Sequence, residues 1–107
     1  MTDCIIVFCT CPDQQSAQKI ADALVNQSCA ACVNLLPGIV STYRWQGKLC
    51  HDQETLLLIK TQQKLFASVE STIKALHPYE LPEIVAVSML QGSQAYIDWI
   101  KQYTSSH

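Results

Sequence analysis

The chain contains little glycine, little proline and few charged side chains. Only three glycines and four prolines occur among 107 residues, and charged residues make up 15%. Loops that cradle nucleotide phosphates need clustered glycines, so the glycine count argues against a nucleotide site of that kind. The charged fraction lies below the roughly 25% typical of soluble domains. This composition favours a protein that buries surface against copies of itself.

Long hydrophobic runs and basic clusters are also missing. The apolar run nearest the amino terminus, residues 4–9, is too short for a membrane span or a signal peptide, and no basic segment precedes it. The formal net charge is −2, and no basic stripe occurs along the chain. That balance argues against nucleic acid as a main partner. We therefore expect a cytoplasmic protein with neither a membrane nor a nucleic-acid partner.

The most informative segment is residues 39–49, where two β-patterned runs meet at Gln46-Gly47. A two-residue turn with glycine predicts a β-hairpin, because glycine readily takes a positive φ. A strand from Val33 to Trp45 would span roughly 40 Å. A globule of this chain length is only about 35 Å across. The hairpin should therefore outgrow its own body, and its free edges predict self-association.

The remaining pattern predicts a single α+β domain over residues 1–107. Periodicity predicts a strand over residues 4–9, hairpin arms over Cys32–Trp45 and 49–61, a helix over 62–76 and a buried strand over 84–90. Pro12 and Asp13 should open a first helix, whose inner residues are Ala17, Ile20, Ala21 and Leu24. Ser93 should cap a last helix, whose inner residues are Tyr96, Ile97 and Ile100. Pro37-Gly38 should form a bulge or bend in the first arm. The order βαββαβ with a C-terminal helix is the ferredoxin-like split β-α-β arrangement.

This topology brings one set of metal-binding residue types together. Right-handed crossovers place the end of the first strand, with Cys9 and Cys11, beside the loop that begins at His77. Two sulfurs and an imidazole suit Cu(I), Cu(II) or Zn(II). The alternative is that Cys9 is a packed core residue and His77 merely ends a helix. No nucleophile-base-acid set occurs in the sequence, so we do not expect an enzyme.

A second cysteine pair forms the motif Cys29-Ala30-Ala31-Cys32, a spacing shared by zinc sites and thiol oxidoreductases. The pair follows a helix C-terminus, whereas redox motifs sit at a helix N-terminus. Packing is therefore the expected role, with thiol oxidoreductase activity as a weaker alternative. All six cysteines should be free thiols or metal ligands rather than disulfides in a reducing cytoplasm.

The second hairpin arm carries His51, Asp52 and Glu54. We expect these side chains on a solvated strand face, with an oxygen-and-nitrogen metal site as the alternative. Tyr43 and Trp45 should share one face of the first arm, for cross-strand or intersubunit packing. Stacking on a ligand is the other reading of this aromatic pair.

Several segments together resemble the CutA family of divalent-cation tolerance proteins. The matching segments are residues 6–13 (IVFCTCPD), residues 29–34, Pro37-Gly38, Ser41-x-Tyr43-x-Trp45-x-Gly47, Glu54, Lys60-Thr61, residues 77–84 (HPYELPEI) and Tyr96-x-x-Trp99. The resemblance implies a ferredoxin-like fold in an interlocked homotrimer similar to PII signalling proteins. It also implies a cytoplasmic protein linked to tolerance of copper and other heavy-metal cations.

The resemblance assigns the metal site to Cys9 and to histidines just before Pro-Tyr. Here His77 is one of these histidines and Leu76 stands at the other position, so Cys11 or a neighbouring subunit would supply a further ligand. We accordingly predict a homotrimer that binds copper-type divalent cations at Cys9 and His77. The alternative is a PII-like trimeric regulatory scaffold that binds a small molecule or protein partner, with cysteines that only pack.

Overall fold

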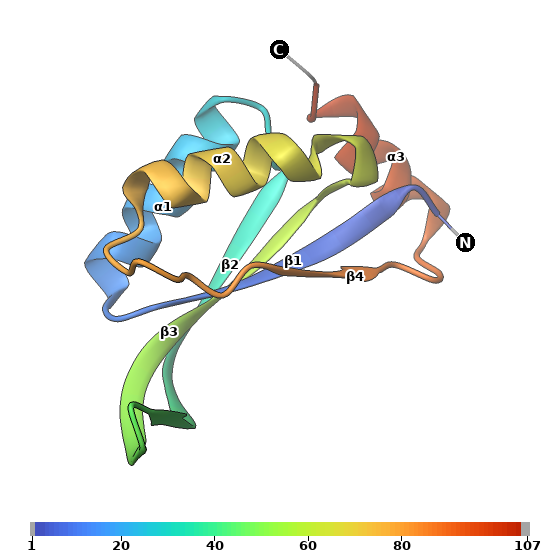
Figure 1. The fold of residues 1–107 in the computed structure, drawn as a ribbon. Helices are drawn as coiled ribbons and strands as arrows, with labels where there is room; N and C mark the ends of the chain where they lie inside the picture. The colour runs from blue at the N-terminus through green and yellow to red at the C-terminus, as the bar shows by residue number, and fades with distance from the viewer. Residues whose placement is uncertain (1, 106–107) are drawn as a thin grey trace.

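The computed structural model describes residues 2–105 as a four-stranded antiparallel sheet with helices packed on it (Figure 1). The elements in chain order are β1 (Cys4–Cys11), α1 (Gln14–Asn26), β2 (Cys32–Trp45), β3 (Lys48–Gln62), a short 3-10 turn η1 (Gln63–Leu65), α2 (Phe66–Leu76), β4 (Val85–Ser88) and α3 (Gln94–Gln102). No helix within the described range is long and apolar enough to cross a membrane. The predicted α+β order is confirmed.

The sheet has the strand order β2-β3-β1-β4, and every neighbouring pair is antiparallel. This order is the ferredoxin-like arrangement predicted from the sequence. The helices α1 and α2 lie side by side over one face of the sheet (Figure 1). The end of β1 and the loop after α2 therefore lie at the same end of the sheet, as predicted.

The main core fills the space between the sheet and these two helices. The predicted inner face of α1, which comprises Ala17, Ile20, Ala21 and Leu24, is buried. Val69 and Ile73 of α2 are fully buried against Leu57 and Ile59 of β3. A smaller second cluster joins α3 to the start of β1, through Ile97, Ile100 and Cys4. Both clusters are built from the apolar periodicity visible in the sequence.

The hairpin of β2 and β3 projects well beyond the helical layer (Figure 1). The chain measures 44 × 26 × 21 Å along its principal axes, so it is strongly elongated. Gln46 and Gly47 both have positive φ, at 51° and 80°. Two consecutive positive φ values match the turn type favoured in two-residue hairpins. The predicted turn and the predicted overhang are therefore confirmed.

One extra residue in β2 reverses the side-chain pattern of the outer hairpin. Leu36 pairs with Leu56, whereas Ile39 pairs with Glu54, so β2 advances three residues while β3 advances two. Gly38, with φ of 80°, supplies the bend. Because side chains alternate between faces, the shift moves Tyr43 from the face covered by helices to the open face. The predicted bulge at Pro37-Gly38 is confirmed, and this consequence of it was not predicted.

Some details of the sequence prediction are wrong. Pro12 lies outside α1, because Asp13 is the N-cap and its side chain accepts a hydrogen bond from the Ser16 backbone N–H at 2.7 Å. The expected buried strand 84–90 is only Val85–Ser88 and is exposed, because β4 is an edge strand without a second layer over it. Tyr96, expected inside, is 40% exposed and stacks on Trp99.

Candidate metal centre

Cys9 and Cys11 project from the end of β1 toward the helices. They pair with Leu57 and Thr55 of β3, and residues directly opposite each other in an antiparallel pair share a face. Both cysteines are fully buried in the main core. The intervening Thr10 pairs with Leu56 and faces the open side of the sheet. The regular strand thus places both sulfurs on one face, as predicted from their spacing.

His77 is the C-cap of α2, where the chain leaves the helix in an extended conformation. Pro78 follows it, and a residue before proline is biased toward this conformation. The imidazole is buried and both of its nitrogens are engaged. The Tyr79 backbone N–H donates to Nδ1 at 3.1 Å, so Nε2 carries the proton and donates to the carbonyl oxygen of Thr10 at 2.8 Å. These two bonds fix the ring at the end of β1.

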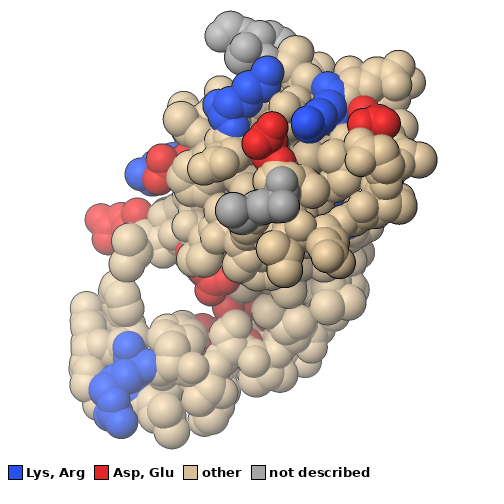
Figure 2. Space-filling model, turned by 90° about the vertical axis from the view of Figure 1, so that its right-hand side faces the viewer, with Lys and Arg blue, Asp and Glu red and all other residues tan. Residues whose placement is uncertain are grey.

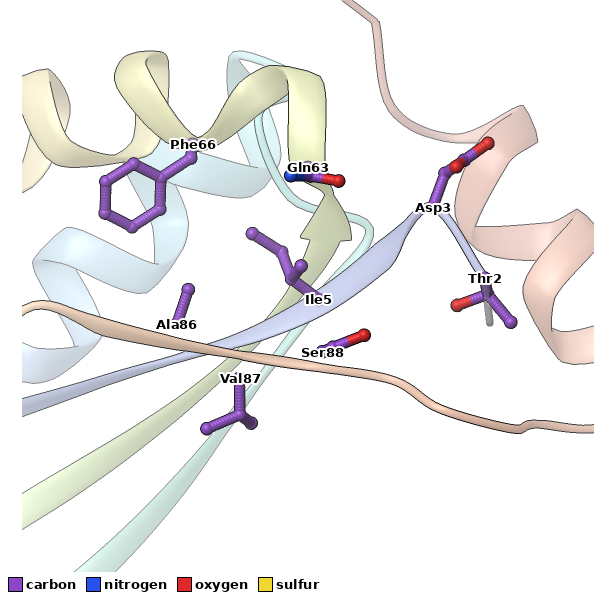
Figure 3. A pocket seen from close by; sticks show the side chains of 8 residues that line it. All are labelled: Thr2, Asp3, Ile5, Gln63, Phe66, Ala86, Val87 and Ser88. Carbon is purple, nitrogen blue, oxygen red and sulfur yellow. The ribbon is translucent and has the colours of Figure 1, made fainter.

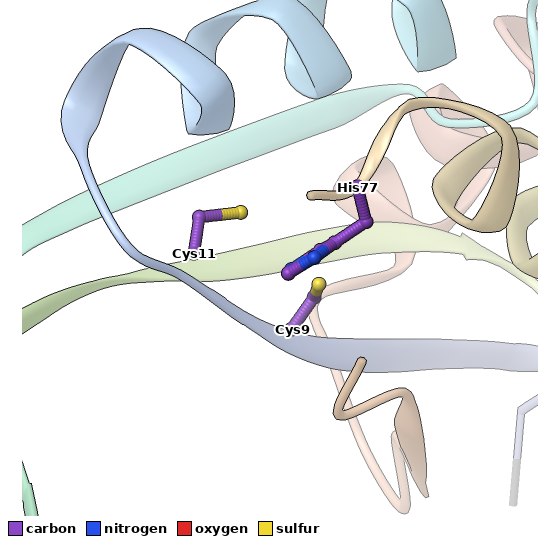
Figure 4. A group of neighbouring side chains, drawn as sticks. All are labelled: Cys9, Cys11 and His77. Atoms are coloured by element: carbon purple, nitrogen blue, oxygen red, sulfur yellow. The ribbon is translucent and has the colours of Figure 1, made fainter. Parts of the chain in front are cut away.

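The three side chains meet in one buried cluster (Figure 4). Their potential ligand atoms, the two sulfurs and one ring nitrogen, all lie within 4.8 Å of one another. Among residues 2–105 this is the one group of three or more His, Cys, Asp or Glu side chains close enough to share an ion. The sequence prediction brought these residues to the same end of the sheet, and the structure places them in reach of a single ion.

The two thiols influence each other strongly. Hydrogen bonding to Cys11, together with burial, raises the pKa of the Cys9 thiol far above its ordinary value. The same interaction lowers the pKa of Cys11, although burial opposes it. Cys11 is therefore the sulfur more ready to lose its proton. Metals bind thiolates, so an ion entering the cluster would bond to Cys11 most easily and displace a proton from Cys9.

The donor set fits a soft or borderline cation. Thiolates and imidazole suit Cu(I) and Zn(II), and the surrounding apolar core excludes competing water. Both ring nitrogens of His77 are hydrogen-bonded, to Thr10 and to Tyr79, so one of these bonds would have to be exchanged for the metal. Leu76 cannot contribute, since its hydrocarbon side chain has no ligand atom; it packs against the main core instead. Two sulfurs and one exchangeable nitrogen are thus the ligands that one chain supplies.

The second cysteine pair lies at the opposite end of the sheet, after the C-terminus of α1. Burial raises the pKa of the Cys29 thiol, which keeps it protonated and unreactive. Cys32 begins β2 and pairs with Lys60. All six cysteines are free thiols. This environment fits the packing role expected for Cys29 and gives no support to thiol oxidoreductase activity.

The expectation of a solvated Glu54 is wrong. Its side chain is buried, with 7% exposed, and accepts a hydrogen bond from the Tyr79 hydroxyl at 2.9 Å. The loop after α2 folds over the open face of the sheet and covers this carboxylate. His51 and Asp52 remain exposed, bonded to Thr42 and Tyr43 across the hairpin. The alternative metal site of His51, Asp52 and Glu54 therefore does not assemble.

Sequence reasoning missed a cavity beside Glu54. A hollow of about 820 Å³ lies between the hairpin and the loop after α2, and its walls include Tyr43, Tyr79 and Glu54. In the space-filling view it is the opening between the body and the hairpin (Figure 2). The signal was the bulge at Pro37-Gly38: counting one extra residue in β2 would have placed Tyr43 opposite the loop.

Comparison with known proteins identifies the family. The family model described as "CutA1 divalent ion tolerance protein" matches residues 5–103. The divalent-cation tolerance protein CutA of Thermus thermophilus is 48% identical over 99 residues, covering 92% of this chain and 96% of that protein. Human protein CutA is 43% identical over 99 residues. The chain spans about half of the human protein, since the match covers 55% of it.

Solved structures agree with these matches. The crystal structure of CutA from Xylella fastidiosa has a TM-score of 0.95 and 46% identity, covering 97% of this chain and all of that one. The Thermus thermophilus structure has a TM-score of 0.93 with 46% identity, covering 95% of this chain and 99% of that one. This chain is therefore a member of the CutA family of divalent-cation tolerance proteins.

Proposed function

We propose that the chain acts as a cytoplasmic homotrimer that binds a copper-type cation reversibly at Cys9 and His77, with Cys11 as the third donor. The observation that carries the proposal is the convergence of two sulfurs and one imidazole nitrogen within 4.8 Å in a buried cluster. Reversible coordination would lower the free concentration of the ion or report it to a partner. Zinc and other divalent cations with an affinity for sulfur belong to the same proposal.

Self-association is supported by two unpartnered features of the single chain. The edge strand β4 leaves Val85 and Val87 exposed. A hollow of about 670 Å³ lies above this strand, bordered by Ile5, Phe66 and Val87 (Figure 3). Exposed strand edges tend to pair with another chain unless they are blocked. The projecting hairpin of one copy could therefore pair with the open strand edge of another copy.

The metal proposal is tested by competition titration of copper against a chelator of known affinity, using the reduced, untagged protein. We expect one ion per chain, and a loss of affinity of tenfold or more in Cys9→Ser and in His77→Ala, in line with removal of a ligand. Cys50→Ser removes a thiol outside the cluster and serves as the matched control. Unchanged affinity and stoichiometry in both cluster variants would refute the proposal.

The trimer proposal is tested by sedimentation equilibrium at micromolar concentration. We expect a mass of three times the 11.9 kDa chain. Val87→Glu places a charge on the exposed edge strand and should dissociate the assembly, whereas Val25→Glu changes an exposed valine on α1 and should not. A stable monomer of the unmodified protein at this concentration contradicts the trimer.

A second function, a PII-like regulatory scaffold, is favoured by the cavity between the hairpin and the loop after α2. Its volume of about 820 Å³ lies within the range of small-molecule sites. Thermal unfolding in the presence of metals and of metabolites separates the two functions. Stabilisation by metals alone favours cation binding, and stabilisation by metabolites alone favours the scaffold.

A further inference from the structure

The cavity has a chemical character that specifies its ligand. Three carboxylates line it, from Glu54, Glu80 and Glu83, and none of its lining residues is Lys or Arg. The two ion pairs found in residues 2–105, Lys74 with Glu70 and Lys101 with Asp3, lie elsewhere. The acidic side chains along the opening are visible in Figure 2. Within one chain the cavity therefore presents negative charge with no Lys or Arg among its lining residues.

Glu54 is the most buried of these three carboxylates. It is 7% exposed and receives one side-chain hydrogen bond, from the Tyr79 hydroxyl at 2.9 Å. Burying a carboxylate is costly unless a positive charge or several donors compensate for the lost water. A single neutral donor compensates only in part. A ligand that brings positive charge and N–H donors to Glu54 would be bound strongly.

The other walls of the cavity are aromatic. Tyr43 and Trp45 come from the outer hairpin, and Tyr79 comes from the loop after α2. A hydrogen bond from the Tyr43 hydroxyl to Asp52 fixes the position of that ring. Aromatic faces attract ammonium and guanidinium groups and also pack against carbon chains. A buried carboxylate bonded to Tyr79, in a cavity whose other walls include Tyr43 and Trp45, is an arrangement suited to an organic cation.

A bare metal ion does not suit this cavity. In the described part of the chain, ligand atoms close enough to share an ion occur only at Cys9, Cys11 and His77. The carboxylates of the cavity are too dispersed to coordinate one ion together. A volume of about 820 Å³ is also far larger than an ion requires. Carboxylates that lie apart from one another suit a molecule whose hydrogen-bond donors are spread over several ångströms.

We infer that the cavity binds a small organic cation, namely an alkyl amine or alkyl guanidinium compound. The carboxylate of Glu54 accepts its N–H donors, and the rings of Tyr43, Trp45 and Tyr79 pack on its charged group and carbon chain. This inference deepens the second function proposed above by naming the ligand class, and it does not depend on the thiol cluster. The site lies on the opposite face of the sheet from Cys9.

The test uses calorimetric titration of the whole protein with n-butylguanidinium and with its neutral analogue n-butylurea. These probes share shape and carbon chain and differ in charge. We expect n-butylguanidinium to bind at least tenfold more tightly, and Glu54→Gln to remove that preference. Glu70→Gln changes a partly exposed glutamate on α2, away from the cavity, and should leave binding unchanged. Equal binding of the two probes, or no binding of either, overturns the inference.

A second variant covers the case in which Glu54→Gln does not fold. Trp45 is 53% exposed at the end of β2, so Trp45→Ala should leave the fold intact and weaken n-butylguanidinium binding severalfold. Unchanged binding in Trp45→Ala overturns the inference. If the unmodified protein binds neither probe and the Trp45→Ala variant no longer assembles, a second copy of the chain fills the cavity. That result also overturns the inference. Stabilisation by anionic metabolites alone rejects the cation class but keeps the scaffold function.

Discussion

The imidazole of His77 donates a hydrogen bond from Nε2 to the carbonyl oxygen of Thr10, over 2.8 Å. This bond connects the buried thiol cluster with the cavity on the open face of the sheet. The side chain of Thr10 lines the cavity on the open face, while Cys9 and Cys11 on either side of it face the thiol cluster. Nδ1 of the same ring accepts from the backbone N–H of Tyr79, whose hydroxyl holds Glu54. An ion that displaces either of these bonds of the ring would therefore disturb the wall of the cavity.

Replacement of His77 by phenylalanine should destabilise the protein. The change leaves the Thr10 carbonyl and the Tyr79 N–H without their partner, and each lost hydrogen bond of a buried group costs about 1–3 kcal/mol. We expect a loss of about 2–4 kcal/mol in the free energy of unfolding. Urea titration of the metal-free protein at fixed chain concentration measures it.

His51→Phe is the control for this substitution. His51 is exposed on the hairpin, and its side chain bonds to the Thr42 hydroxyl at 3.1 Å. A surface change of this kind should alter the free energy of unfolding by less than about 0.5 kcal/mol. Equal effects of the two histidine substitutions would show that the buried bonds of His77 contribute nothing.

The phenol of Tyr43 should lose its proton at a higher pH than an ordinary tyrosine does. The hydrogen bond to Asp52 is the largest cause that raises the pKa of Tyr43, from 10.0 to about 12. Because the folded pKa is the higher one, this bond stabilises the fold fully below pH 10.0, and the contribution is lost as the pH rises toward 12. Absorbance of phenolate during alkaline titration, with Tyr43→Phe to assign the signal, measures the shift.

Asp52→Asn should bring the pKa of Tyr43 back toward its ordinary value, since the charged acceptor is removed. Asp98→Asn is the control, because this carboxylate lies on α3 and bonds to Gln94 instead. A Tyr43 titration that is unaffected by Asp52→Asn contradicts the assigned hydrogen bond.

The cap of α3 should be a measurable source of stability. The Ser93 hydroxyl accepts from the backbone N–H of Tyr96 at 3.2 Å. Ser93→Ala removes this acceptor and should lower the free energy of unfolding by about 1 kcal/mol. Ser71→Ala, at an exposed position inside α2, should be neutral or slightly stabilising because alanine favours helix. Thermal unfolding of both variants compares them, and equal losses would argue against the cap.

The hairpin turn offers two substitutions with opposite expected signs. Gly47 has φ of 80° and open space around it, so Gly47→Ala meets only backbone strain, of roughly 1–2 kcal/mol. Gln46 has φ of 51°, a conformation that asparagine tolerates better, so Gln46→Asn should strengthen the turn. Amide hydrogen exchange of Trp45, which pairs with Lys48 directly beside the turn, should accelerate in the first variant and slow in the second. The same direction in both would refute the assigned turn.

Local signals sufficed for most of the fold. Helix periodicity identified the buried face of α1, and the Gln46-Gly47 turn together with long β-patterned arms identified a hairpin larger than the body. Topology then brought Cys9, Cys11 and His77 to one end of the sheet without any structural information. These features depend on short stretches of sequence or on rules of chain connection, which one sequence contains.

Burial that depends on distant segments was not predictable in this way. Glu54 is buried because Tyr79, twenty-five residues further along the chain, lies over it, and nothing near Glu54 in the sequence indicates this. The exposure of β4 follows from its place at the edge of the sheet, although Val85 and Val87 are typical of a buried strand. Tyr96 was misplaced because α3 packs inward through Ile97 and Ile100, which leaves Tyr96 at the margin of the buried face, stacked on Trp99.

The shift at Pro37-Gly38 uncouples the orientation of the outer hairpin from the number of residues in β2. The outer arm takes its orientation from its pairing with β3, in which Glu54 and Leu56 lie on the same face. Removing the extra residue would therefore leave Tyr43 and Trp45 on the open face, now as members of a regular strand. The aromatic wall can thus survive the gain or loss of one residue at the bulge, provided that the Gln46-Gly47 turn keeps the same residues paired.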